Sequence, residues 1–337
     1  MTTAIRQYFL GPIIIALLGF AAVWYEAGIS ALFIVVILSI LEVTLSFDNA
    51  VVNARVLEKM SPVWQKRFLT WGILIAVVGT RLVLPIVIVS VAVWASPWFI
   101  TKLAFSDPEA YGVLLEGVRG AITAFGGIFL LMVSLKYFFD VGKSVHWISQ
   151  IERHFVKWGR MEALEIAIAI AVLIGLSFVS PFDQASILVA GFVGLLLFIL
   201  MEGIGGSLSL ESNQVAKSGL VLFIYLNILD SAFSLDGVIG AFALSSNLLI
   251  IVTGLGIGAY FVRAFTLYMV KCKTLTHLIY LEQGAHWAIL GLAVAMLANL
   301  VIHVPEIITG LVGLFCVAFA YRASVREAKA HHTTNPA

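Results

Sequence analysis

Two short acidic motifs lie inside long apolar stretches of the chain. The first, residues 41–49, reads LEVTLSFDN, and the second, residues 229–237, reads LDSAFSLDG. Each contains an acid, three residues, a serine, an apolar residue and an aspartate. Each is followed by an arginine inside the next apolar stretch, Arg81 or Arg263. Ionisable residues are costly inside a membrane span, so these positions are candidates for function.

The motif side chains offer oxygen atoms and neither sulfur nor imidazole nitrogen. Carboxylate, amide and hydroxyl oxygens suit hard cations such as Mn²⁺, Mg²⁺ or Ca²⁺ better than Zn²⁺ or Cu⁺. Four acids against two arginines leave a net negative pocket, which can neutralise one dication while protons come and go. The candidate metal ligands are Glu42, Asp48, Asn49, Asp230, Ser234 and Asp236. The supporting residues are Ser46, Asn53, Asn227, Arg81 and Arg263.

Helical periodicity places most of these residues on two polar stripes. At about 100° per residue, one face of the first segment carries Glu42, Ser46, Asn49 and Asn53. The matching face of the second carries Asn227, Asp230, Ser234 and Gly237. Asp48 and Asp236 lie off these faces, so we expect the helices to break near Asn49 and Gly237, where Gly and Asn tolerate unusual backbone angles.

The composition places these motifs in a bilayer. Of the 337 residues, 61% are hydrophobic and only 12% are charged, and the mean hydropathy is +1.05. A soluble domain carries roughly 25% charged residues. The net charge of +1 leaves no basic excess for nucleic acid. Cys272 and Cys316 are the only cysteines, which excludes a disulfide framework or a CxxC-type site.

Ten stretches are long and apolar enough to be read as membrane helices. They cover about 9–25, 30–53, 68–95, 112–139, 161–180, 185–204, 217–245, 248–270, 284–302 and 306–322. We therefore expect an all-α polytopic protein with a single transmembrane domain over 1–337, ending in a short cytoplasmic tail, 323–337. The motifs recur five helices apart, which predicts two inverted repeats, about 9–180 and 185–322, with an ion site between them near the midplane.

The distribution of positive charge sets the expected orientation. Fifteen of the 20 Lys and Arg residues fall on the side of the N-terminus, which predicts that both termini are cytoplasmic. The chain shows no organelle-targeting segment, so we expect an inner (plasma) membrane of bacterial type. The polar stretch 140–160 is typical of an interfacial helix with aromatic anchors. Gly254, Gly256 and Gly258 favour close helix packing rather than a phosphate loop.

The two motifs and the arginines that follow them resemble those of TerC integral membrane proteins. The chain departs from that pattern at Asp236-Gly237, where TerC-like proteins usually carry Asp-Ser. The resemblance implies metal-ion export of the kind linked to manganese efflux and tellurite resistance, in a family grouped with the LysE-type exporters. It also implies that Glu42, Asp48, Asn49, Asp230 and Asp236 form the ion site.

These observations favour a secondary transporter that exports a divalent cation, above all Mn²⁺, in exchange for protons. One alternative is a calcium or other cation exchanger. Another is a membrane scaffold or auxiliary protein of tellurite or metal stress resistance, in which the acids only pair with Arg81 and Arg263. No HExxH, GxSxG or peptidase-type aspartate pair is present, so we expect neither an enzyme nor a bound cofactor. A monomer and a homodimer both stay open.

Overall fold

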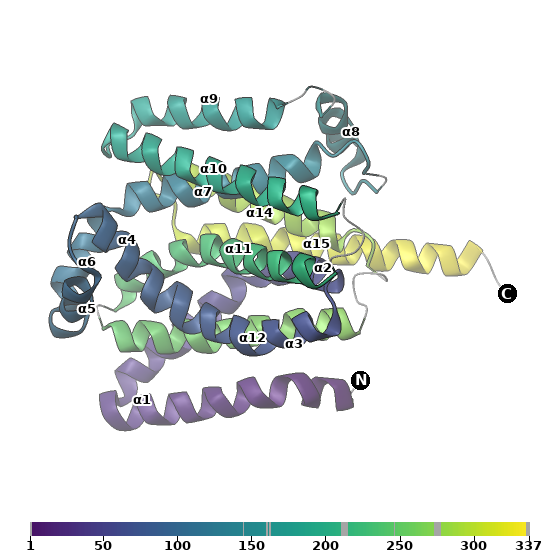
Figure 1. Ribbon diagram of the computed structural model, residues 1–337. Helices are drawn as coiled ribbons and strands as arrows, with labels where there is room; N and C mark the ends of the chain where they lie inside the picture. The colour runs from purple at the N-terminus through teal and green to yellow at the C-terminus, as the bar shows by residue number, and fades with distance from the viewer. Residues whose placement is uncertain are drawn as a thin grey trace.

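The computed structural model describes residues 2–143, 145–159, 161, 163–209, 215–245, 247–272 and 278–334, which form helices and short connections with no strand among them (Figure 1). The helices of the first half are α1 (Thr2–Leu45), α2 (Phe47–Glu58), α3 (Pro62–Leu74), the π-helix η1 (Ile75–Val83), α4 (Leu84–Ala92), α5 (Pro97–Ser106), α6 (Pro108–Gly117), α7 (Arg119–Phe138), α8 (Ser149–Trp158) and α9 (Leu164–Val179). Those of the second half are α10 (Gln184–Ser209), α11 (Val215–Leu244), α12 (Leu248–Lys271), α14 (Leu281–Ala298) and α15 (Glu306–Thr334).

The helices bear out the membrane character expected from the composition. Six in the described part are long and apolar enough to cross a bilayer: Tyr8–Leu45, Pro62–Ala92, Arg119–Phe138, Gln184–Gly203, Leu248–Lys271 and Leu281–Ala298. Leu164–Val179 and Gly219–Ala232 are shorter apolar helices. The ten expected stretches fall mainly on helix in the described part, but two of them are divided. The second is divided at Ser46, between α1 and α2, and the fourth at Val118, between α6 and α7.

Helix α1 contains a reversal of the chain at Gly28. Its φ of 81° and ψ of −177° are not helical, and φ in this region suits glycine. In the N-terminal arm (2–27), Gly11 lies against Tyr260 and Gly19 against Ile257, so this arm runs antiparallel to α12. The C-terminal arm (29–45) runs parallel to α12 (Figure 1). The reversal separates two of the expected apolar stretches, 9–25 and 30–53.

Glycines allow α12 to pack closely against two neighbours. Gly254 lies against Leu38 and Gly258 against Glu42, both on the C-terminal arm of α1, whereas Gly256 lies against Val77 of η1. A methyl group at Gly258 would stand 2.5 Å from Cβ of Glu42, so only glycine fits without a shift. The structure thus confirms that these glycines serve close helix packing.

Helix η1 interrupts the segment between α3 and α4. The π-helix is rare and is often found at functional sites. It ends two residues before Pro85, which has no N–H to bond to the carbonyl of Arg81 four residues earlier. Arg81 lies inside this irregular turn and is buried.

Helix α7 has four helices, α9, α10, α11 and α14, packed around it. Gly126 and Gly127 lie against Met296 and Leu297 of α14, and near the other end of α7 the Tyr137 ring stacks on His286 of α14 with centroids 3.5 Å apart. These contacts show that α7 and α14 are antiparallel. Figure 1 places α4, α5 and α6 at one end of the bundle and α8 at the other, together with the beginning of α1 and the end of α15.

Candidate functional site

The two acidic motifs lie side by side and run in opposite directions. Nδ2 of Asn49 in the first motif donates a hydrogen bond of 2.8 Å to Oδ1 of Asp230 in the second. At the other end of the contact, a methyl group on Gly237 would lie 3.7 Å from Oε2 of Glu42. Glu42 therefore lies beside Gly237 and Asn49 beside Asp230, so the two motifs are antiparallel.

Each inner acid pairs with the arginine that follows its motif. Arg81 of η1 binds Oε1 of Glu42, and Nη2 of Arg263 lies 3.0 Å from Oδ2 of Asp230. The side chains of all four residues are at least nine-tenths buried. The expected pairing of acids with arginines is thus present in both motifs.

Local contacts fix the orientation of both arginines. Nη1 of Arg81 donates to the carbonyl of Ala76 and, over 3.1 Å, to the hydroxyl of Thr80. The Arg263 guanidinium lies 3.9 Å above the centre of the Phe68 ring. Gly72 leaves room for it, because a methyl group there would stand 3.0 Å from Nη1. Hydrogen bonds within η1 and the pair with Glu42 therefore hold the guanidinium of Arg81. The Phe68 ring and the pair with Asp230 hold that of Arg263.

Several buried oxygen atoms around this contact have no hydrogen-bond partner among the described residues. They are Oδ1 of Asn49, Asn53 and Asn227 and Oγ of Ser234. The serine of the first motif differs, since Oγ of Ser46 donates to Oε1 of Glu42 over 2.8 Å. Buried polar atoms are almost always bonded, so such a group of unpaired oxygens calls for an explanation. A cation would provide one.

The structure brings together most of the residues expected from the sequence. Asn49, Asn53, Asn227 and Ser234 are buried on the facing parts of α2 and α11, with Glu42 and Asp230 paired as described. Asp48 and Asp236 lie on α2 and α11, but their side chains fall outside the described part of the structure.

The expected helix breaks are only partly right. The first motif is interrupted at Ser46, with φ −101° and ψ 12°, rather than near Asn49, which lies inside α2. The break near Gly237 is wrong, because α11 continues from Val215 to Leu244. A glycine permits unwinding without requiring it, and within a bilayer a continuous helix satisfies every backbone group by itself.

The described charges at the contact cancel. Two carboxylates face two guanidinium groups, and no group of three or more His, Cys, Asp or Glu side chains in the described part is arranged to hold a metal ion. A cation site would therefore depend on amide and hydroxyl oxygens, or on the outer aspartates of the motifs.

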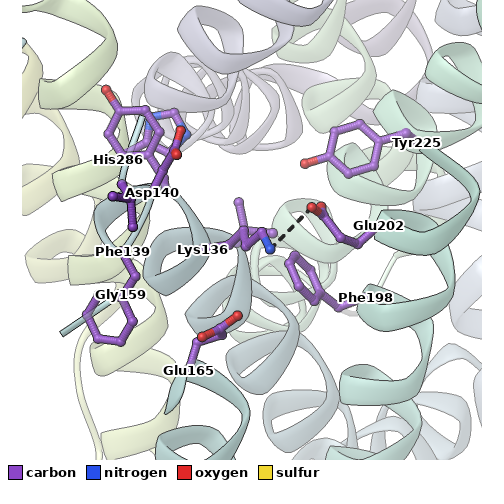
Figure 2. A pocket seen from close by; sticks show the side chains of 12 residues that line it. Lys136, Phe139, Asp140, Gly159, Glu165, Phe198, Glu202, Tyr225 and His286 are labelled. Atoms are coloured by element: carbon purple, nitrogen blue, oxygen red, sulfur yellow. Dashed lines mark ion pairs between the residues drawn. The ribbon is translucent and has the colours of Figure 1, made fainter. Parts of the chain in front are cut away.

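The structure also shows two polar centres that sequence reasoning missed. Lys136 of α7 and Glu202 of α10 face each other at 3.5 Å in a cavity (Figure 2). Glu152 of α8 is completely buried and bonded to Lys143 and Trp287. For the Lys136–Glu202 pair, the available signal in the sequence was a lysine inside the apolar helix α7. The sequence held no comparable signal for Glu152, since α8 was expected at the interface.

The architecture is that of a polytopic helical membrane protein with buried acid–arginine pairs. Residues 47–331 match a family described as a protein of unknown function, DUF475, and the chain belongs to this family. The matched region contains the second motif, both arginines and the last three residues of the first motif, 47–49, and it begins after Glu42. No curated protein and no solved structure matches the chain.

Proposed function

We propose that the protein is a secondary transporter that exports a divalent cation, Mn²⁺ in preference to others, through the contact between its two acidic motifs. The observation that carries the proposal is the antiparallel crossing of the motifs, where four buried oxygen atoms of the described residues lack a partner. Oxygen ligands without thiolate or imidazole select hard cations. The proposal assigns no enzymatic reaction and no bound cofactor to the chain.

An inverted repeat accounts for this crossing. Two copies of one unit inserted in opposite senses present equivalent residues in reverse order, as Glu42 to Asn49 and Asp230 to Gly237 do. The pairs Glu42–Arg81 and Asp230–Arg263 also have the same order along the chain. On this proposal residues 9–180 and 185–322 are the repeats, the chain crosses the inner (plasma) membrane ten times, and both termini are cytoplasmic. A distant relationship to TerC-like exporters is part of the same proposal.

The charge balance suggests how a dication is accommodated. Arg81 and Arg263 neutralise Glu42 and Asp230, which leaves Asp48 and Asp236 to contribute a charge of −2 when ionised. Binding of M²⁺ then gives a neutral assembly, and protonation of the aspartates on the opposite side releases the ion. This exchange couples the export of the metal to protons.

The scaffold alternative has one specific observation in its favour. Both inner acids are already paired with arginines, and buried ion pairs can serve structure alone. On that hypothesis the unpaired oxygens of Asn53, Asn227 and Ser234 have no task. A calcium exchanger would use the same oxygen ligands and differs only in the ion carried.

Metal flux into proteoliposomes tests the proposal. Purified protein is reconstituted, and uptake of Mn²⁺, Ca²⁺, Mg²⁺ and Zn²⁺ is followed with and without a pH gradient. Glu42→Gln, Asp230→Asn and Asp236→Asn should abolish Mn²⁺ flux, whereas Glu109→Gln, an exposed acid on α6, should not. Folding of every variant is verified by its melting temperature. Folded wild-type protein that carries no dication would leave the scaffold alternative standing, and a preference for Ca²⁺ would favour the exchanger.

A further inference from the structure

A cavity of about 490 Å³ lies at the end of the bundle where α8 is found, away from the acidic motifs. It is formed between the last turn of α7 and parts of α9, α10, α11 and α14, and Figure 2 shows charged and aromatic side chains around it. Its volume is in the range of small-molecule sites, about 300–1,000 Å³.

The charges of the cavity are predominantly negative. Asp140, Glu165 and Glu202 contribute three carboxylates from three different parts of the chain, and Lys136 contributes the one ammonium group among the described lining residues. The Lys136–Glu202 pair is long, 3.5 Å, and about half of each side chain is exposed, so it is a weak pair that an incoming cation can rearrange. The described lining thus has a net charge of −2 when His286 is neutral.

Aromatic rings form much of the remaining wall. Tyr137, Phe139, Phe198 and Tyr225 line the cavity, and in Figure 2 Phe198 and Tyr225 lie on either side of Glu202. Ring faces attract organic ammonium groups, whereas a metal ion in its hydration shell gains little from them. Lys143 illustrates the preference nearby, because its Nζ lies 4.3 Å from the centre of the Tyr137 ring.

His286 adds a buried acceptor to the lining. The residue is 8% exposed, and its Nδ1 lies 2.8 Å from the carbonyl oxygen of Glu282. A carbonyl only accepts hydrogen bonds, so Nδ1 carries the proton and Nε2 of the neutral ring is an acceptor. No group in the described part of the chain bonds to Nε2. An ammonium ligand in the cavity would donate to Nε2.

We propose that this cavity binds a short aliphatic diammonium ion. Its carboxylates are not gathered around one point, since the described residues contain no group of three that could hold a metal ion. A ligand with two separated positive charges and an apolar linker matches carboxylates spread around aromatic walls. The two charges of the ligand also equal the net charge of the lining. The site is separate from the acidic motifs and does not depend on the proposed transport activity.

Binding of putrescine to the purified full-length protein tests the proposal. Isothermal titration in detergent should show one saturable site, with MgCl₂ and propylamine as competitors at matched ionic strength. Removal of one charge-assisted contact in Glu165→Gln should weaken binding about tenfold. Phe198→Leu keeps an apolar residue but removes the ring, and should weaken binding several-fold. Glu109→Gln and Asp230→Asn should bind like the wild type.

Each other outcome contradicts the proposal in its own way. Displacement of putrescine by Mg²⁺ at equal concentration, with unchanged binding in Phe198→Leu, would indicate a hydrated dication instead. Loss of binding in folded Asp230→Asn would locate the diamine at the acidic motifs. Absence of saturable binding to folded wild-type protein would show that the cavity takes no diamine, whatever the result of the metal flux experiment.

Discussion

Asn49 and Asp230 are 181 positions apart in the chain, yet the amide of the first donates a hydrogen bond of 2.8 Å to the carboxylate of the second. This bond joins the end of the first motif to the beginning of the second inside an apolar bundle. Oδ2 of the same carboxylate is bound by Arg263, so Asp230 receives donors from two helices. The rest of the candidate site is arranged around this carboxylate.

Loss of the Asn49 donor should destabilise the protein. Hydrogen bonds to charged groups contribute about 1.5–3 kcal/mol, and Asn49→Ala leaves a buried carboxylate with one fewer donor. Thermal unfolding in detergent should show a decrease of that size in the free energy of unfolding. Thr101→Ala, which removes a hydrogen bond on exposed helix α5, is the control and should change stability by less than about 1 kcal/mol. Equal effects of the two substitutions would contradict the buried geometry.

The Glu42–Arg81 pair should be more costly to break on one side than to remove completely. Arg81→Met strands a buried carboxylate and is expected to cost about 3–5 kcal/mol, while Glu42→Leu/Arg81→Met removes both charges and should recover most of that loss. Chemical denaturation of the single and double variants provides the coupling energy. The exposed pair Glu116–Arg119, treated in the same way, should give about 0–1 kcal/mol. A coupling energy near zero for the buried pair would contradict the prediction.

Close packing at α12 gives a steric prediction. Gly258→Ala brings a methyl group within 2.5 Å of Cβ of Glu42 and 2.8 Å of the Ser39 carbonyl oxygen, so α1 and α12 must separate. Overpacking of this kind typically costs about 1–3 kcal/mol. The melting temperature should fall, and Mn²⁺ flux should fall with it if the proposed function holds. Gly175→Ala on α9 meets nothing within 4 Å and should not lower the melting temperature.

The attachment of α8 should weaken in acid. Burial raises the pKa of Glu152, but hydrogen bonds from Lys143, Trp287 and the Ile148 amide, with the charge of Lys143, outweigh burial and hold that pKa below the ordinary 4.5. A carboxyl whose pKa is lower in the folded state stabilises the fold above the unfolded value, and this contribution is lost as pH falls through the folded value. The stability advantage of the wild type over Glu152→Gln at pH 7 should therefore shrink as the pH is lowered below about 4.5.

Thermal melts measure the difference in stability between the wild type and Glu152→Gln across the acid range. They are monitored by tryptophan fluorescence, to which Trp287 contributes. Glu109→Gln, which changes an exposed acid on α6, serves as the comparison. If the advantage of the wild type over Glu152→Gln stays constant from pH 7 into the acid range, Glu152 does not act as a buried, hydrogen-bonded carboxylate.

The sequence predicted the helices well because hydrocarbon-like composition over about 20 residues leaves few alternatives to helix. The pairing of Glu42 with Arg81 and of Asp230 with Arg263 could also be anticipated, since a buried charge requires a partner. The inverted repeat and the ten spans stay predictions, because six helices in the described part are long and apolar enough to cross a bilayer.

Other features depend on contacts that no local pattern reveals. The burial of Glu152 results from Trp287 of α14, 135 positions away, and α8 looks like an ordinary interfacial helix without it. The cavity is assembled from parts of five helices, so its charges look unrelated along the chain. The first motif breaks at Ser46 in place of Asn49, and α11 does not break at Gly237, so conformational freedom at a residue does not determine where a helix actually ends.

The reversal at Gly28 has a mechanical consequence. The two arms of α1 pack against α12, one antiparallel and one parallel to it, so a helix of the second half of the chain lies against both arms of a helix of the first. A movement that preserved these contacts would carry α1 and α12 together, along with Glu42 and Arg263. The units that move against each other would then each contain helices from both halves of the chain. Their boundary would therefore not coincide with the boundary of the sequence repeats between residues 180 and 185.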